Sequence, residues 1–189
     1  MNYVRGFAPW LCYAALSPVD WRLGTGAAAL AALWLLAGQL RARSVDLLGA
    51  ATCAFFVVMA VVALADPASG LRHWICALAN ATLAATALAS LAVRRPFTLA
   101  FARAEVAPEF WHSPRFIRVN MVLTTIWASA FALGALACAL VVGYDHSATA
   151  PLVAAQVLAF VVPFVLSGRY AARAKAAAAN ATAAGQAIA

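Results

Sequence analysis

The chain has 189 residues, of which 66% are hydrophobic and 10% are charged. A soluble domain carries roughly 25% charged residues, so this chain has too few polar side chains to cover a water-exposed surface. A spanning helix needs about 20 apolar residues, which leaves room for about four to six spans with short connections. The formal charge of +7 raises the question of nucleic acid, but the basic residues stand at the ends of apolar runs, where they meet lipid headgroups. We expect no nucleic-acid partner.

The first apolar stretch, residues 6–17, is too short to cross a bilayer as a helix. It ends at Ser17-Pro18, and Asp20, Trp21 and Arg22 follow as a cluster typical of the membrane interface. We therefore expect an N-terminal re-entrant or interfacial half-segment instead of a full span.

Five longer apolar runs follow, and turn-forming or charged residues bound them. The second run ends at Asp66-Pro67 and the third at Arg94-Arg95-Pro96, while the fifth opens on Pro151 in its first turn. The predicted fold is an all-α, polytopic transmembrane helical bundle formed by a single domain, residues 1–170. Its spans are expected at about residues 23–40, 45–65, 74–93, 119–142 and 151–168. Residues 171–189 are alanine-rich and low in complexity, and they are predicted to form a flexible tail.

The basic residues predict the orientation of these spans. With five spans, one side of the membrane collects Arg41 and Arg43, five arginines between the third and fourth spans, and Arg169, Arg173 and Lys175. The other side keeps Arg5, Arg22 and Arg72. Because Lys and Arg accumulate on the cytoplasmic side, we expect a multi-pass protein of a bacterial inner membrane with a cytoplasmic C-terminus.

Residues 94–118, which we call the polar segment, form the one long polar interval in the apolar body of the chain. Phe97, Ala100, Phe101 and Ala104 fall on one helical face before Pro108, so a short helix is expected to lie in the cytoplasmic headgroup layer. Two interpretations remain open: the segment anchors two spans, or it docks a partner or lipid. The candidate residues for binding a partner or lipid are Arg94, Arg95, Arg103, Trp111 and Arg118.

The predicted spans have uncharged interiors, whereas pumps and proton-coupled carriers carry ionisable residues there. They do contain uncharged polar residues that could line a common seam: Asn80, Thr82, Thr86, Asn120, Thr124 and Gln156. Small and hydroxylated residues at helical spacing allow helices to pack closely and to hydrogen-bond across the contact. The alternative is that the polar seam forms a pathway for a solute.

Cysteine and histidine positions give no sign of a metal site or a disulfide. Cys12, Cys53, Cys76 and Cys138 lie in separate apolar runs without CxxC spacing, and they are expected to act as small buried hydrophobes. Glu109 and His112 have a metal-ligand spacing, but His73 and His146 are predicted to lie across the membrane from them. With no nucleophile beside a base, we expect neither an enzyme nor a cofactor.

A set of short features occurs along the chain, each of them once. They are Gly6-Phe7-Ala8-Pro9, Asp20, Arg41 and Arg43, Trp74, Arg94-Arg95-Pro96, Trp111, Asn120 and Trp127. This layout resembles the septation protein A-like family of bacterial inner-membrane proteins, or a sister group of it, over nearly the whole length. The chain departs from the family in having Arg where Lys is frequent, and in a longer, proline-richer stretch at 103–118.

The resemblance implies a function in the cell envelope without bringing catalytic residues. It implies a non-enzymatic role in envelope maintenance or septation, through contacts with other integral membrane proteins or with further copies of the chain. We therefore expect an interaction or scaffold protein whose polar segment meets a partner or anionic lipid headgroups. The alternative is a small-solute or lipid translocator, an oligomeric channel or transporter that uses the polar seam.

Overall fold

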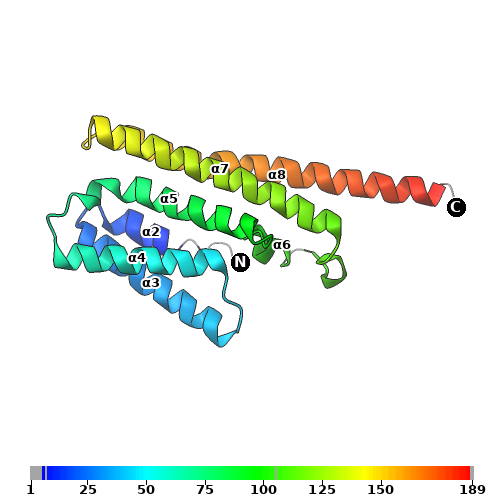
Figure 1. Ribbon diagram of the computed structural model, residues 1–189, viewed down its shortest axis with the longest axis horizontal. Helices are drawn as coiled ribbons and strands as arrows, with labels where there is room; N and C mark the ends of the chain where they lie inside the picture. The colour runs from blue at the N-terminus through cyan, green and yellow to red at the C-terminus, as the bar shows by residue number, and fades with distance from the viewer. Residues whose placement is uncertain (1–5, 7, 105, 188–189) are drawn as a thin grey trace.

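The computed structural model is all-α (Figure 1). It describes residues 6, 8–104 and 106–187, with side chains as far as residue 177. In chain order the helices are α2 (Ala8–Leu16), α3 (Trp21–Arg41), α4 (Leu47–Ala65), α5 (Leu71–Ala92), the short α6 (Thr98–Ala102), the 3₁₀ turn η1 (Pro108–Phe110), α7 (Pro114–Tyr144) and α8 (Thr149–Ala187).

Five of these helices are long and apolar enough to cross a membrane: α3, α4, α5, α7 and α8 as far as Ala177. They run alternately up and down the length of the molecule (Figure 1). Their exposed surfaces carry large apolar side chains such as Leu64, Leu133 and Phe164, which suit contact with lipid tails. The chain is thus a multi-pass integral membrane protein, and the predicted fold class with five spanning helices is confirmed.

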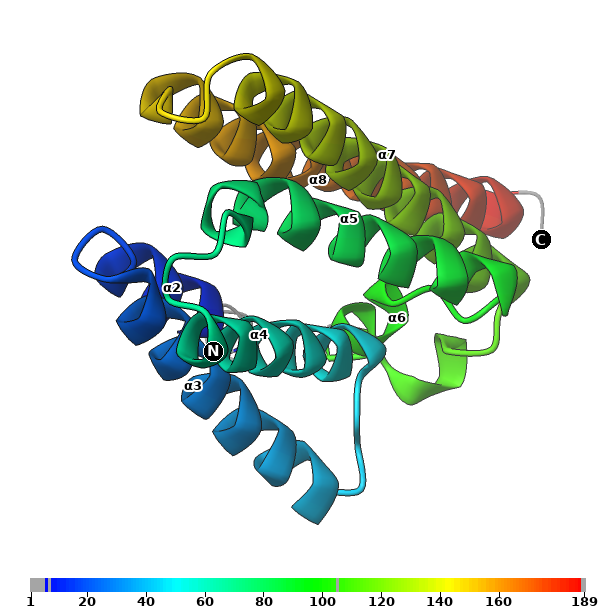
Figure 2. The same cartoon turned by 60° about the vertical axis from the view of Figure 1, so that its left-hand side comes forward.

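The short helix α2 packs beside the first half of α3, near the turn that joins α4 to α5 (Figure 2). Its Trp10 ring lies 4.7 Å from the ring of Phe56, which is fully buried on α4. The turn between α2 and α3 is tight, because a Cβ at Gly24 would lie 2.9 Å from the backbone of Ser17. Asp20 caps α3, and its hydrogen bonds with Arg22 lower the pKa of the Asp20 carboxyl below its usual range.

The centre of the bundle is the contact between α5 and α7. Leu83 and Ala84 on α5 pack with Phe131 on α7, and Trp127 and Phe160 cover this cluster. Farther along α7, a Cβ at Gly134 would lie 2.8 Å from Ala159 Cβ on α8 and 3.0 Å from Asn80 Oδ1 on α5. Three helices therefore meet at Gly134, where a side chain would hold them apart.

Two predicted boundaries differ from the structure. Helix α7 begins at Pro114, and not near residue 119, because the Ser113 hydroxyl accepts a hydrogen bond from Phe116 N–H and proline fits the first helical turn. Arg115 and Arg118 thus belong to a helix. The range predicted as a flexible tail is helical as far as Ala187, since alanine has the highest helix propensity of all residues. Residues 188 and 189 lie outside the described residues.

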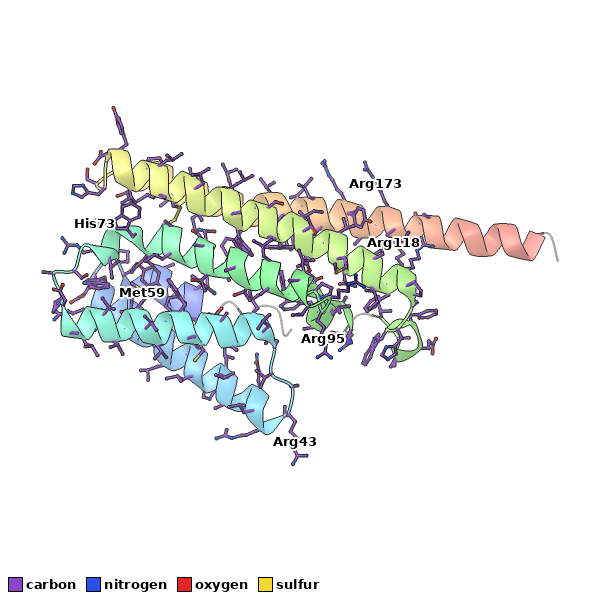
Figure 3. All side chains as sticks on the ribbon, in the orientation of Figure 1. Arg43, Met59, His73, Arg95, Arg118 and Arg173 are labelled. Carbon is purple, nitrogen blue, oxygen red and sulfur yellow. A yellow bond between two sulfur atoms is a disulfide. The ribbon has the colours of Figure 1, made fainter. Side chains whose placement is uncertain are left out.

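The two ends of the bundle differ in charge. One end of the bundle holds the C-terminal end of α5 and the later part of α8, and toward it lie Arg43, Arg95, Arg118 and Arg173 (Figure 3). His73 lies at the opposite end. There its ring lies 4.9 Å from that of His146. The helix directions place Arg41, Arg94, Arg103, Arg115, Arg169 and Lys175 toward the first end as well, which we call the basic end. Arg22 and Arg72 lie at the other end, and Arg5 lies outside the described residues.

The close approach at Gly134 is expected to be sensitive to a single methyl group. Gly134→Ala should lower the free energy of unfolding by about 1–3 kcal/mol, as overpacking of a well-filled core does. Thermal melting in detergent, followed by circular dichroism, measures the change. Gly143→Ala is the matched control, because Gly143 lies on the same helix and a Cβ there would have no neighbouring atom within 4 Å. Equal melting of the two variants would show that the three helices do not meet closely at Gly134.

Candidate functional site

The polar segment begins with an unusual helix end. Past the C-terminal residue of α5, Arg94 N–H donates to Leu91 O and Arg95 N–H donates to Ser90 O, which are the two bonds of a Schellman motif. The motif places Arg94 at φ 55°, a left-handed conformation in which glycine is usual. Arg43 ends α3 in the same way at φ 52°, where Arg43 N–H donates to Leu40 O and Ser44 N–H donates to Gln39 O. Both helices thus place arginine at a position that costs an L-residue roughly 1–2 kcal/mol.

A buried hydroxyl on α5 fixes the start of the polar segment. Ser90 Oγ donates to Ala87 O at 2.7 Å and accepts from Phe97 N–H at 3.2 Å. Pro96, which directly precedes Phe97, is buried. Because irregular backbone at membrane depth needs internal partners for its polar groups, this hydroxyl stabilises the turn that brings the chain back under α5.

Helix α6 is held against α7 by hydrogen bonds among buried groups. Thr98 Oγ1 lies 3.0 Å from Asn120 O and 2.9 Å from Thr124 Oγ1, and all three residues are buried. The Asn120 side chain donates to Phe116 O at 2.9 Å on its own helix. Thr98 on α6 is therefore joined to the fourth span through the backbone carbonyl of Asn120 and the side chain of Thr124, two residues predicted for the polar seam.

The structure corrects the prediction of an amphipathic helix over residues 97–104. Helix α6 is five residues long, and its buried residues are Thr98 and Leu99, while Ala100 and Ala104 are exposed. The apolar spacing suggested an interfacial face, but the Thr98 hydroxyl finds its partners on α7 and turns a different face inward.

The second half of the polar segment is ordered by Trp111. Its indole N–H donates to Val106 O at 2.8 Å, and the Arg103 guanidinium carbon lies 5.4 Å from the centre of the ring. Such cation–π contacts contribute about 0.5–1 kcal/mol at exposed sites. Phe110, beside Trp111 in the chain, is 54% exposed. The segment thus presents arginine and aromatic side chains from a backbone with internal hydrogen bonds.

The five residues predicted to bind a partner or lipid share one end of the molecule but do not form one cluster. Arg94, Arg95 and Arg103 are exposed, and Trp111 is half-buried against Arg103. Arg118 is set apart from them, since it lies on α7 beside α8 and lines a hollow there with Tyr170 and Arg173 (Figure 3). Glu109 and His112 are exposed, and the described residues contain no group of three His, Cys, Asp or Glu that could hold a metal.

The polar seam is divided into two separate clusters. Asn80 is buried on α5, and its Nδ2 donates to Gln156 Oε1 on α8 at 2.7 Å and to Cys76 O at 2.9 Å. Asn120 lies 14 residues before Gly134, the neighbour of Asn80, which is about 21 Å along a helix. The apolar cluster around Leu83 and Phe131 fills the interval.

Thr82 and Thr86 join neither cluster. Their hydroxyls donate to Leu78 O and Thr82 O on their own helix, at 2.8 Å each. Back-bonding of this kind satisfies a hydroxyl within the helix. The six residues of the polar seam therefore fall into a contact between α5 and α8, a contact between α6 and α7, and two self-satisfied threonines.

The expectation that the cysteines form no disulfide is wrong. Cys76 on α5 and Cys138 on α7 are joined by a disulfide, with Cα atoms 5.9 Å apart, and Gln156 Oε1 lies 3.2 Å from Cys76 Sγ. The sequence separation of 62 residues carried no spacing signal, because the pairing depends on how α5 and α7 pack. Cys12 and Cys53 are free.

Sequence reasoning also missed Ser90 and Thr98 as residues that order the polar segment. Ser90 lies at helical spacing from Thr82 and Thr86, and this spacing gives no indication that its hydroxyl reaches Phe97. Thr98 lies in a stretch whose aromatic residues gave the stronger pattern. A hydroxyl directly after Arg-Arg-Pro is the one local signal that could have suggested a tie back to a helix.

Comparison of the chain with protein-family models, with curated proteins and with solved structures finds no match.

The contact between Thr98 and α7 is expected to keep the polar segment ordered. Thr98→Val would leave Thr124 without its hydroxyl partner, at a cost of about 1–3 kcal/mol for a buried unsatisfied group. In protein reconstituted into nanodiscs, trypsin should then cut after Arg103 several-fold faster. Thr125→Val is the matched control, because its hydroxyl bonds Met121 O on its own helix and is exposed. If the two variants are cut at the same rate, Thr98 does not hold the segment.

The disulfide gives a direct count of thiols. In protein unfolded with sodium dodecyl sulfate, an alkylating reagent should modify Cys12 and Cys53 alone, and all four cysteines after reduction. Peptide mass spectrometry locates the modified residues. Alkylation of Cys76 and Cys138 in protein that was isolated with blocked thiols and never reduced would contradict the bridge.

Proposed function

We propose that the protein is a non-enzymatic interaction or scaffold protein of the bacterial cell envelope, acting in envelope maintenance or septation. It would reside in the inner (cytoplasmic) membrane with its C-terminus in the cytoplasm. Its partners would be other integral membrane proteins or further copies of the same chain, together with anionic lipid headgroups.

The observation that carries this proposal is the order of the polar segment. Hydrogen bonds from Ser90, Thr98 and Trp111 fix its backbone, while Arg94 and Arg95 remain exposed. A loop that merely joined two spans would not need buried anchors in both of them. A preorganised surface with arginine and aromatic side chains loses little conformational freedom on binding, which favours recognition of a partner.

Two independent features support the proposed orientation. The basic end carries ten of the thirteen Lys and Arg residues, as cytoplasmic ends do. The disulfide lies near the other end, since Cys76 is in the second turn of α5 and Cys138 is about two turns before the end of α7. Disulfides form in the bacterial periplasm and are rare in the cytosol.

A translocator is the second candidate, and one observation favours it. Asn80 Oδ1 and Asn120 Oδ1 are buried and, among the described residues, have no hydrogen-bond partner. Free acceptors inside a bundle are features of solute pathways. The apolar cluster around Phe131 separates the two asparagines, so the pathway would have to run between copies of the chain.

The scaffold is tested by crosslinking in intact cells that express the protein with a C-terminal green fluorescent protein. This tag fluoresces when it folds in the cytoplasm, so the same strain reports the orientation. Wild type is compared with Arg94→Glu, Arg95→Glu, Arg103→Glu, and captured proteins are identified by mass spectrometry. Since three reversed charges replace attraction by repulsion, we expect the variant to lose a defined envelope partner by roughly tenfold or more.

The matched control reverses three charges at the same end but outside the polar segment, Arg41→Glu, Arg43→Glu, Lys175→Glu, and should retain the partner. Capture of the chain by itself as a discrete oligomer that ignores the polar-segment charges would overturn the scaffold. Solute flux through that oligomer, abolished by Asn80→Leu, would then establish the translocator. A dark tag in cells with normal protein levels would contradict the orientation.

A further inference from the structure

A cationic hollow lies between the start of α7 and the later part of α8. Its cavity volume is about 430 Å³, and it is lined by Arg115, Arg118, Val119, Tyr170, Arg173 and Ala174. Residues three and four apart share a helix face, so the first three come from one face of α7 and the last three from one face of α8. The α7–α8 contact therefore brings three arginines to the lining of one hollow.

The charge of the α7–α8 hollow is not balanced by the protein. No carboxylate lines it, and the ion pair recorded among the described residues is Arg22 with Asp20, at the opposite end of the bundle. Arg115 Nη2 donates to Ala174 O at 2.7 Å, which links the two helices and leaves the other N–H groups of this guanidinium free to bind a ligand. Guanidinium groups present donors in a planar fork that matches phosphate, and an anion would relieve their mutual repulsion.

The depth of the α7–α8 hollow corresponds to the headgroup layer. Arg118 directly precedes the apolar run of α7, and Tyr170 follows the apolar run of α8 that ends near Ser167. Tyrosine is enriched where hydrocarbon meets headgroups. The lining thus has an aromatic residue at the apolar boundary and arginines on the polar side of it.

The surface below the hollow indicates which phosphate compound would bind. Leu166 and Val162 precede Tyr170 by one and two helical turns, and they are 45% and 43% exposed. A lipid with its phosphate among the arginines would lay its acyl chains along these side chains, where a free phosphate ion would have no contact. Burial of acyl methylene groups against such a surface contributes to affinity in proportion to area.

We propose that Arg115, Arg118 and Arg173 form a binding site for the phosphate of an anionic phospholipid headgroup, with Tyr170 beside it and the acyl chains on α8. The inference deepens the proposed function, because it assigns the expected contact with anionic lipid to one defined site. The site lies apart from Arg94, Arg95 and Arg103, so a partner can bind those three arginines while a lipid occupies the hollow.

The test is a lipid titration of the purified full-length protein in detergent, read by native mass spectrometry. Phosphatidylglycerol is compared with phosphatidylcholine of the same acyl chains, for wild type and for Arg115→Gln, Arg118→Gln, Arg173→Gln. Wild type should bind phosphatidylglycerol at least roughly tenfold more tightly than phosphatidylcholine, and the variant should lose this preference. Arg173→Lys, which keeps the charge but not the fork, should fall between them.

The matched control, Arg41→Gln, Arg43→Gln, Lys175→Gln, removes three charges of the basic end outside the hollow and should keep the preference. An equal loss in this control would show a diffuse charge effect and overturn the site. Displacement of the lipid by millimolar inorganic phosphate would identify a free-anion site instead, and equal binding of both lipids would exclude recognition of charge. Should the triple variant fail to fold by circular dichroism, Arg173→Gln alone decides in the same way, since this exposed side chain is free of packing constraints.

This measurement uses protein without any partner, so its outcome does not depend on the crosslinking experiment. A protein that binds phosphatidylglycerol at the α7–α8 hollow but captures no envelope partner would retain the site and lose the scaffold. The reverse result would retain the scaffold and lose the site.

Discussion

The hydrogen bonds of Thr98 with Asn120 O and Thr124 Oγ1 are the contact on which the arrangement at the basic end depends. The chain between α5 and α7 must turn back under the bundle without regular helix, and its polar groups are costly wherever water does not reach them. Thr98 meets this constraint from α6, and Ser90 meets it from α5. With both ends fixed, Arg94, Arg95 and Arg103 extend from a backbone of defined shape, which is the basis of the proposed recognition surface.

The packing of α5 on α7 makes these contacts possible, and small residues allow it. Gly134 lets Asn80 approach α7 closely enough to reach Gln156 on α8, and Cys76 and Cys138 close the same region covalently. In a bilayer the lipid tails are as apolar as the helices, so close packing and hydrogen bonds across the contact replace the hydrophobic driving force. The α5–α7 pair is therefore the rigid centre, and α8, with many exposed apolar side chains, is the helix most open to lipid.

Much of the architecture was predictable, because apolar run length and charged boundaries are local properties of a sequence. The five spanning helices follow from them, as does the end at which each arginine of the described residues lies. The candidate site was predictable in part. The exposed arginines followed from the sequence, but the division of the polar seam did not, since the separation of Asn80 from Asn120 depends on Phe131 and Leu83 meeting between them. The disulfide was missed for the same reason, because two lone cysteines 62 residues apart pair only through the fold. The helical tail was missed because low complexity was given more weight than the helix propensity of alanine.

The chemistry of the two ends bears on orientation in two unrelated ways. Lys and Arg counts reflect how spans are inserted into a membrane, whereas a disulfide reflects the redox state of the compartment that its cysteines face. Here the basic end lies opposite the disulfide between α5 and α7. In the opposite orientation, the excess of Lys and Arg would lie on the periplasmic side, against the usual distribution. The disulfide would then lie toward the reducing cytoplasm. The proposed orientation accounts for both features, and it would place the polar segment and the α7–α8 hollow on the same side, against the leaflet whose anionic lipids attract arginine. A partner and a lipid would then meet the protein on one face of the membrane, through arginines that the fold keeps in two separate places.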